Sequence, residues 1–258
     1  MRTTALITGA SSGLGLEFAR LFAADGYDLV LVARNEERLQ SLATELKTAH
    51  RISTEVIAID LSLPDAAVHL VQELQRKNIR IHTLVNNAGL GAFGLFHETP
   101  YDQEKNLLQV NITALTDLTK MLLPGMVQRQ SGAILNVAST AAFQPGPLMA
   151  VYFASKAYVM HLSVALSREL QGTGVTVTCL CPGPTKTGFE KNAHMEDSKL
   201  FHRKTMDAAT VARIGYRALR HKRPLVVAGN INVFGAFMTR FIPRTWAARV
   251  AMHVQAPR

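Results

Sequence analysis

The sequence predicts an α/β fold with a doubly wound parallel sheet of about seven strands flanked by helices. A glycine-rich turn follows the first apolar run, strand-like runs alternate with helical stretches, and several runs are continuously apolar, as in strands buried on both faces. The 258 residues, 48% of them apolar, can bury one large core. The expected strands cover residues 3–8, 27–34, 54–60, 81–87, 132–138, 174–181 and 224–228.

The first expected strand leads into a turn with the spacing Gly-x-x-x-Gly-x-Gly, and an amphipathic helix pattern follows it. Strand, glycine turn and helix are the context that a dinucleotide site requires, because glycines permit a tight turn and a close approach to a pyrophosphate. The N–H groups and dipole at the helix start favour that negative charge. The turn lacks the Gly-Lys-Ser/Thr ending of a P-loop. The residues expected to contact the cofactor here are Gly9, Ser11, Ser12, Gly13, Leu14 and Gly15.

The second expected strand ends at Ala33 and Arg34, where a carboxylate would be expected for binding the ribose of NAD. A guanidinium at this position suits a 2′-phosphate, which it can bind through two hydrogen bonds. The sequence therefore predicts NADP(H) as the cofactor rather than NAD(H). The alternative is that Arg34 only faces solvent at a helix start, near Glu36 and Glu37.

Tyr152 and Lys156 lie four residues apart, with Ser139 upstream of them. On a helix these positions share a face, so the ammonium can lie beside the phenol and favour its ionised form. A free tyrosine has a pKa of about 10, and a neighbouring cation moves that pKa toward the useful range. The Ser139 hydroxyl would donate to the same substrate oxygen. Because Tyr-x-x-x-Lys is a short motif, a half-buried tyrosine beside a solvated lysine is the alternative.

Several motifs follow one another in a characteristic order. They are Thr8–Gly15, Asn86-Asn87-Ala88-Gly89, Asn111, Ser139, Tyr152–Lys156 and Pro182-Gly183. In this order and approximate spacing the chain resembles the classical short-chain dehydrogenases/reductases, and it looks most similar to their NADP-preferring branch. The resemblance implies a single Rossmann-type domain, NADP(H) as cofactor and a carbonyl or alcohol as substrate. Taken singly, the asparagines could be ordinary turn residues and Ser139 an ordinary loop serine.

The resemblance also implies a role for each site residue. Tyr152 would be the acid in carbonyl reduction and the base in alcohol oxidation, and Ser139 would orient the substrate oxygen. Lys156 would bind the nicotinamide ribose and lower the pKa of Tyr152, while Asn111 would hold a water that links Lys156 to solvent. Further cofactor contacts would come from Asp60, Leu61, Asn87, Ala88, Gly89, Pro182, Gly183 and Thr187.

Neither cysteine is expected to take part in chemistry. Cys179 and Cys181 lie two apart on an expected strand, and we expect their side chains on opposite faces, without a disulfide between them. No metal site is expected, because Cys-x-Cys offers too few ligands and no histidine spacing accompanies it. The sequence shows no signal-peptide pattern and no run of about 20 apolar residues. We therefore expect a reducing, cytoplasmic location.

The net charge of +9 is partly explained by an anionic cofactor, and acidic substrates or a membrane surface are further explanations. We expect residues 1–229 to form the catalytic domain and residues 230–258 a basic, apolar extension. Its pattern, interrupted at Pro243, fits a helix lying on a membrane, a flap over the substrate cleft or a subunit contact. We expect a homodimer or homotetramer. Nucleic acid is not an expected partner, because the charge looks dispersed and no recognition module is apparent.

Substrate selectivity is expected from residues 90–96, 143–149 and 188–205. The first two segments are mostly apolar and favour a lipophilic substrate, and the third resembles the mobile lid of the family. We predict reversible hydride transfer between the nicotinamide C4 and a steroid-like, 3-ketoacyl or related ketone. Two alternatives are a nucleotide-sensing protein that does no chemistry and a nucleotide-sugar epimerase or dehydratase. The complete Asn-Ser-Tyr-Lys set argues against the first, and the short chain against the second.

Overall fold

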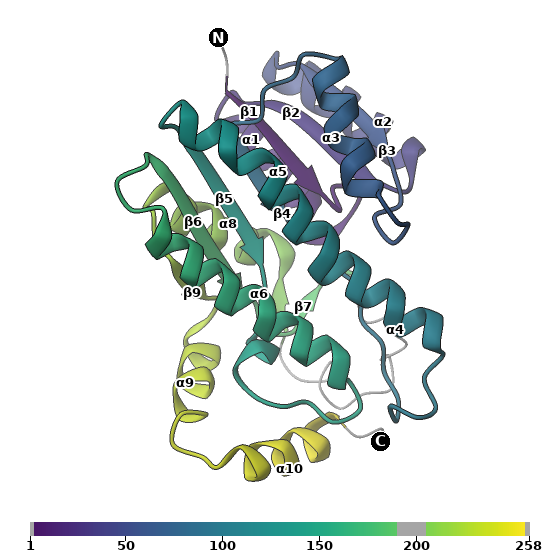
Figure 1. Ribbon diagram of the computed structural model, residues 1–258, viewed down its shortest axis with the longest axis vertical. Coiled ribbons are helices and arrows are strands. Elements are labelled where there is room, and N and C mark those ends of the chain that lie inside the picture. The colour runs from purple at the N-terminus through teal and green to yellow at the C-terminus, as the bar shows by residue number, and fades with distance from the viewer. Residues whose placement is uncertain (1–2, 190–204, 256–258) are drawn as a thin grey trace.

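The computed structural model describes residues 3–189 and 205–255. Its centre is a seven-stranded parallel sheet with the strand order β3-β2-β1-β4-β5-β6-β9 (Figure 1). The strands are β1 (Thr4–Thr8), β2 (Asp28–Ala33), β3 (Thr54–Ala58), β4 (Thr83–Asn86), β5 (Gly132–Val137), β6 (Val175–Cys181) and β9 (Leu225–Val227). The predicted doubly wound fold is confirmed, and each predicted strand contains one of these seven. A further ladder of two short strands, β7 (Thr185–Lys186) and β8 (Met206–Asp207), was not predicted.

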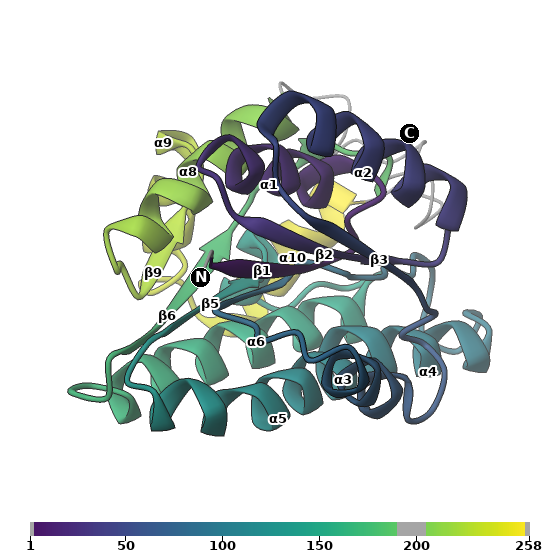
Figure 2. The ribbon, with the colours of Figure 1, turned by 90° about the horizontal axis from the view of Figure 1, so that it is seen from above.

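Helices cover both faces of the sheet. In Figure 2, α1 (Gly13–Ala24), α2 (Glu36–His50) and α8 (Ala208–Arg220) lie on one side, and α3 (Ala66–Arg76), α5 (Leu115–Gln128) and α6 (Ala150–Glu169) lie on the other. Phe18 and Phe22 of α1 are fully buried on the first face, and Leu70 and Leu74 of α3 are buried on the second. Burial on both sides explains the continuously apolar strands, because alternate side chains of each strand enter different cores.

The strand order changes direction between β1 and β4, which are neighbours in the sheet although two strands separate them in sequence. In open parallel sheets, ligands bind beyond the carboxyl ends of the strands at such a switch point. The turn after β1 and the segment after β4 therefore meet at the position where a ligand cleft is expected.

The chain beyond β9 forms two helices, α9 (Asn230–Met238) and α10 (Arg244–Gln255). Figure 1 shows both beyond the carboxyl ends of the strands, outside the layers that flank the sheet. The interruption predicted at Pro243 is confirmed, because α10 begins at the next residue. None of the helices in the described ranges is long and apolar enough to cross a bilayer.

Candidate active site

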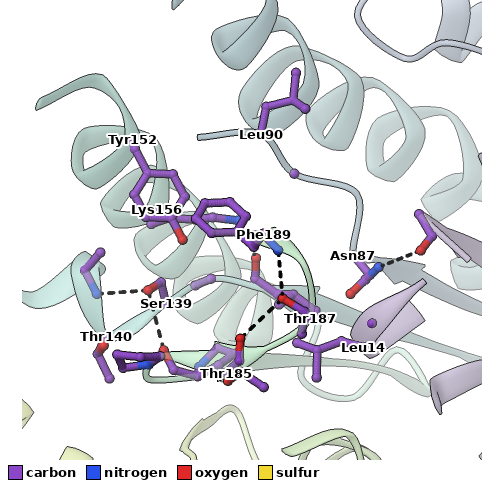
Figure 3. A pocket seen from close by; sticks show the side chains of 18 of the residues that line it. Leu14, Asn87, Leu90, Ser139, Thr140, Tyr152, Lys156, Thr185, Thr187 and Phe189 are labelled. Carbon is purple, nitrogen blue, oxygen red and sulfur yellow. Dashed lines mark hydrogen bonds between the residues drawn. The ribbon is translucent and has the colours of Figure 1, made fainter. Parts of the chain in front are cut away.

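A cavity of about 840 Å³ opens at the carboxyl ends of the central strands (Figure 3). Of the residues predicted for the site, Gly15 and Asn111 alone do not line this cavity. Those that do are Gly9, Ser11, Ser12, Gly13, Leu14, Arg34, Asp60, Leu61, Asn87, Ala88, Gly89, Ser139, Tyr152, Lys156, Pro182, Gly183 and Thr187. Seven separate segments of the sequence thus converge on one space, which is large enough for a dinucleotide and a small substrate.

The glycine turn after β1 requires residues that have no Cβ. Gly9 and Gly13 have positive φ values of 68° and 54°, which residues with a Cβ rarely adopt. A Cβ on Gly15 would lie 2.1 Å from the carbonyl oxygen of Gly9, so the helix start packs directly on the turn. Ser12 caps α1 without a side-chain hydrogen bond to the helix. The first N–H groups of α1 are therefore available to an anion in the cavity.

Asn87 joins the end of β4 to this turn. Its Nδ2 donates to the carbonyl oxygens of Thr8, at 2.9 Å, and Gly9, at 3.3 Å. The Thr8 hydroxyl oxygen accepts from the backbone N–H groups of Asn87 and Ala88, each at 3.0 Å. These bonds hold the two sides of the switch point together. The position of Thr8 in the glycine motif could have identified this bracing role, although Thr8 was not predicted as a site residue.

Arg34 follows β2 at the edge of the cavity, with its side chain 64% exposed and its Nη1 4.0 Å from the Asp60 carboxylate. Asp60 also accepts from the backbone N–H and hydroxyl of Ser62, at 2.9 and 2.8 Å. Arg38, four residues after Arg34, lines the same end of the cavity and was not predicted. The spacing of four residues across the start of α2 could have identified it. Two guanidinium groups therefore border the end of the cavity nearest β2.

Tyr152 extends from the first turns of α6, and its hydroxyl is directed toward Ser139 in Figure 3. The Ser139 Oγ accepts from the Ala141 N–H at 3.1 Å and lies 3.5 Å from the Pro182 carbonyl oxygen. Burial raises the pKa of Tyr152 to about 12, and the hydrogen bond with Ser139 opposes this shift. The predicted lowering of this pKa by Lys156 stays a prediction. The Lys156 Nζ lies 5.7 Å from the centroid of the phenol ring.

The Lys156 side chain is 5% exposed, and its Nζ donates to the Val137 carbonyl oxygen at 3.0 Å. Burial lowers the pKa of Lys156 to about 8, which the nearby thiols of Cys179 and Cys181 partly oppose. Within residues 3–189 and 205–255, no carboxylate forms an ion pair with this ammonium. The alternative of a solvated lysine is therefore excluded, and the remaining N–H groups of Lys156 are available within the cavity.

Asn111 lies behind the cavity in a short π-helical stretch, η1 (Gln109–Ala114), between α4 (Tyr101–Leu108) and α5. Its Oδ1 accepts from the Leu90 N–H at 2.8 Å, and its Nδ2 donates to the Leu90 carbonyl oxygen and the Ser155 hydroxyl, each at 3.0 Å. Asn111 thus fixes the loop after β4 against α6 next to Lys156. Single π-helical turns of this kind occur frequently at functional sites. Its predicted water-holding role stays a prediction.

The segment after β6 closes the other side of the cavity. A Cβ on Gly13 would lie 2.9 Å from the Cβ of Thr187, so this segment packs on the glycine turn. Thr187 accepts from the Phe189 N–H at 3.3 Å, and the Phe189 ring lies 5.3 Å from the ring of Tyr152. Most of the predicted lid, residues 190–204, lies outside the described residues.

The helices after β9 also contribute to the cavity wall. A Cβ on Gly183 would lie 2.3 Å from Nδ2 of Asn232, which places α9 directly against the segment after β6. The lining residues from α9, α10 and the link between them are Ile231, Asn232, Gly235, Ala236, Thr239, Val250, Ala251, Val254 and Gln255. Of the three roles left open for this extension, a position beside the cleft is the one that these contacts support. The individual residues could not be predicted, because their spacing fits all three roles.

The prediction for the cysteines was wrong in one respect. Residues two apart on a strand point to the same face, and the two Sγ atoms lie 3.8 Å apart in one buried cluster. Both thiols are free and pack against Val159 and Met160 of α6, in keeping with a packing role. Among the described residues, no group of three or more His, Cys, Asp or Glu side chains could hold a metal ion.

Comparison with known proteins identifies the family. The sequence profile of the short chain dehydrogenases matches residues 3–198, so the chain belongs to the short-chain dehydrogenase/reductase family. It is 36% identical over 193 residues to a very-long-chain 3-oxoacyl-CoA reductase of Pyrenophora tritici-repentis, a match that covers 73% of this chain and 57% of that protein. The chain thus spans little more than half the length of this relative. It is also 40% identical to sulfoacetaldehyde reductase 2 of Chromohalobacter salexigens, over 73% and 75% of the two chains.

Solved structures show the same fold and two different cofactors. A short-chain dehydrogenase from Sphingobium yanoikuyae in complex with NADPH is 32% identical, with a TM-score of 0.83 over 95% of this chain and 98% of that one. A family member from Burkholderia phymatum in complex with NAD is 25% identical, with a TM-score of 0.83 over 92% of both chains. The fold is therefore one that binds nicotinamide cofactors, and likeness alone does not select between NADPH and NAD.

Proposed function

We propose that the protein is an NADP(H)-dependent oxidoreductase that interconverts a lipophilic ketone and the corresponding secondary alcohol. The observation that carries this proposal is the convergence of Ser139, Tyr152 and Lys156 at one end of a cavity whose other end has a glycine turn and two arginines. A nucleotide-binding protein without chemistry would not need a phenol, a hydroxyl and a buried ammonium beside its ligand.

The residues present fit a dinucleotide. The bare glycine turn and the free N–H groups at the start of α1 suit the pyrophosphate. Arg34 and Arg38 suit a 2′-phosphate. Residues 33–35, at the end of β2, include no acid that would repel this phosphate. Lys156 would donate to the nicotinamide ribose with the N–H groups that Val137 leaves free. When bound, the nicotinamide supplies or accepts the hydride.

The protein's own residues manage the proton and the charge on the substrate oxygen. In reduction, Tyr152 would donate its proton to that oxygen as negative charge develops there. Ser139 would donate a second hydrogen bond, because the Ala141 N–H fixes its oxygen and the 3.5 Å contact with Pro182 leaves its proton weakly held. The Lys156 ammonium adds positive charge close to both groups. In oxidation the same proton transfers run in reverse.

The substrate end of the cavity favours a lipophilic molecule. Leu90, Met149, Phe153 and Phe189 surround the space in front of Tyr152, and the side chain of Gln144 is a polar exception. Apolar walls with a few convergent polar groups are typical of sites for small organic ligands. An NADPH-oxidation screen over steroids, 3-ketoacyl thioesters, quinones, sugars and small ketones tests this class. Turnover confined to sugars would contradict it.

The cofactor preference is tested with Arg34→Ala. Hydrogen bonds to a charged group contribute about 1.5–3 kcal/mol, so the variant is expected to raise KM for NADPH about 10- to 100-fold and to leave KM for NADH nearly unchanged. Arg168→Ala, which removes an exposed arginine near the far end of α6, serves as the matched control. A wild-type enzyme that prefers NADH would show that Arg34 does not bind a phosphate.

The raised pKa of Tyr152 predicts different pH profiles in the two directions. Because burial moves this pKa above its ordinary value to about 12, the phenol keeps its proton through the neutral and mildly alkaline range. Reduction needs the protonated phenol and the charged Lys156, whose pKa is about 8, so its kcat/KM should stay level below about pH 8 and decline above it. Oxidation needs the phenolate, so its kcat/KM should rise about tenfold per pH unit up to about pH 8, where Lys156 begins to lose its charge. An oxidation profile that levels off near neutrality would indicate that bound cofactor and Lys156 lower this pKa.

A further inference from the structure

The excess positive charge of the chain is concentrated, contrary to the dispersed charge expected from the sequence. Residues 1–207 contain 19 Lys or Arg and 19 Asp or Glu, whereas residues 208–258 contain 9 Lys or Arg and no acidic residue. The whole net charge of +9 therefore comes from the last 51 residues. Arg240, Arg244 and Arg249 lie on or between α9 and α10, are exposed, and form no ion pair within the described ranges.

Large apolar side chains are exposed on the same two helices and their link. Phe234 is 67% exposed, Phe241 68% and Trp246 63%, although such side chains are normally removed from water. Ile231, Val233, Phe237, Ile242, Val250 and Met252 are also exposed on the same two helices and their link. A concentration of exposed apolar groups of this kind marks an interaction surface in a soluble domain. We refer to the exposed residues Phe234, Phe241, Trp246 and the three arginines of these two helices and their link as the α9–α10 surface.

Each of the two helices has one side that is buried or lines the cavity and another side that is exposed to solvent. On α10, Ala247, Ala251 and Gln255 are buried at intervals of four residues, while Trp246 and Arg249 face outward. On α9, Asn232, Gly235 and Ala236 line the cavity, while Phe234 does not. The outward aromatic and basic residues are therefore not needed to form the cavity wall. Their exposure indicates that they contact a partner outside the cavity.

We propose that the α9–α10 surface docks the protein on an anionic membrane surface. Aromatic side chains that enter the headgroup region beside arginines that meet anionic lipids are the features of a helix lying on a membrane. A second copy of the chain fits this surface less well. A two-fold contact would bring the same arginines of both copies together, with no acid in residues 208–258 to offset them. Docking here would bring the cavity wall formed by α9 and α10 next to the lipid.

Vesicle co-sedimentation of the purified full-length protein tests the proposal. The protein is expected to pellet with phosphatidylcholine vesicles that contain about one third phosphatidylglycerol, and to remain in solution with phosphatidylcholine alone. The double variant Phe234→Ser/Trp246→Ser and the double variant Arg244→Glu/Arg249→Glu should each lower the partition coefficient about tenfold or more. Circular dichroism and cofactor binding verify that the variants are folded.

Lys222→Glu/Arg223→Glu is the matched control for charge. This variant changes the net charge by the same amount as Arg244→Glu/Arg249→Glu, and its residues also belong to the acid-free segment 208–258. Lys222 and Arg223 lie before β9, however, at the opposite end of this strand from α9. This variant should pellet like the wild type. An equal loss of binding in the control would show that only overall charge matters, and no pelleting of the wild type would exclude docking. Light scattering that shows an oligomer dissociated by Phe234→Ser/Trp246→Ser would assign the surface to a second copy instead.

Discussion

Tyr152→Phe is expected to lower kcat for carbonyl reduction by a factor of about 10²–10⁴, which is the usual contribution of a positioned proton donor. The substitution removes one hydroxyl and keeps the ring, which packs beside Phe153 and Phe189. The fold and the Kd for NADPH should therefore change little, because the glycine turn and the arginines at the other end of the cavity are unaffected. Steady-state kinetics with NADPH and fluorescence titration of the cofactor measure the two effects separately.

Tyr158→Phe is the matched control for this substitution. Tyr158 lies on the same helix, α6, is exposed, and has its hydroxyl 3.0 Å from the hydroxyl of Thr116, away from the cavity. Its loss should leave kcat unchanged. If Tyr152→Phe kept the wild-type kcat, Tyr152 would not be the acid. If it lost cofactor binding together with activity, its role would be structural.

Gly15→Ala is expected to damage both the fold and the cofactor site. The added Cβ would lie 2.1 Å from the Gly9 carbonyl oxygen and 2.6 Å from Nδ2 of Asn87, so the turn and α1 would have to move apart. Overpacking of this kind costs about 1–3 kcal/mol of unfolding free energy. Because the same movement displaces the N–H groups that face the pyrophosphate, the Kd for NADPH should rise at least about tenfold. Urea unfolding and cofactor titration measure these changes.

Gly125→Ala is the control for Gly15→Ala, because it places alanine in a helix without a close contact to another segment. Gly125 lies inside α5, where a Cβ would meet only the Arg129 side chain, at 3.5 Å. Alanine there should stabilise the protein by up to about 1 kcal/mol, because glycine is a poor helix former. Equal unfolding free energies for Gly15→Ala and the wild type would show that α1 does not pack on the turn as closely as described.

The fold and most of the site could be predicted from the sequence because both depend on local patterns. Apolar runs predict the strands, and the glycines after β1 predict a tight turn, because glycine adopts positive φ values without steric cost. The joint order of the motifs from Thr8 to Thr187 selects one family, and almost all of the predicted residues line one cavity.

What could not be predicted depends on packing between distant segments. Burial raises the pKa of Tyr152 and the hydrogen bond with Ser139 opposes that shift, and neither effect can be read from the helical spacing to Lys156. The amide of Asn111 is occupied by Leu90 and Ser155, which only the tertiary structure reveals. The position of α9 depends on the contact between Gly183 and Asn232. Cys179 and Cys181 were predicted on opposite faces of their strand because the alternation of side chains was applied wrongly. Their Sγ atoms lie 3.8 Å apart, on the same face.

The central claim is that the protein transfers a hydride and a proton to a carbonyl group at Tyr152. It is tested most directly with NADPH that carries deuterium at both C4 positions of the nicotinamide and a set of lipophilic ketones. Mass spectrometry of the product is expected to show one deuterium on the carbinol carbon with the wild type, and at least about a hundredfold less labelled alcohol with Tyr152→Phe. Tight binding of NADPH without labelled alcohol from any ketone would contradict the claim and would favour a protein that senses nucleotides without chemistry.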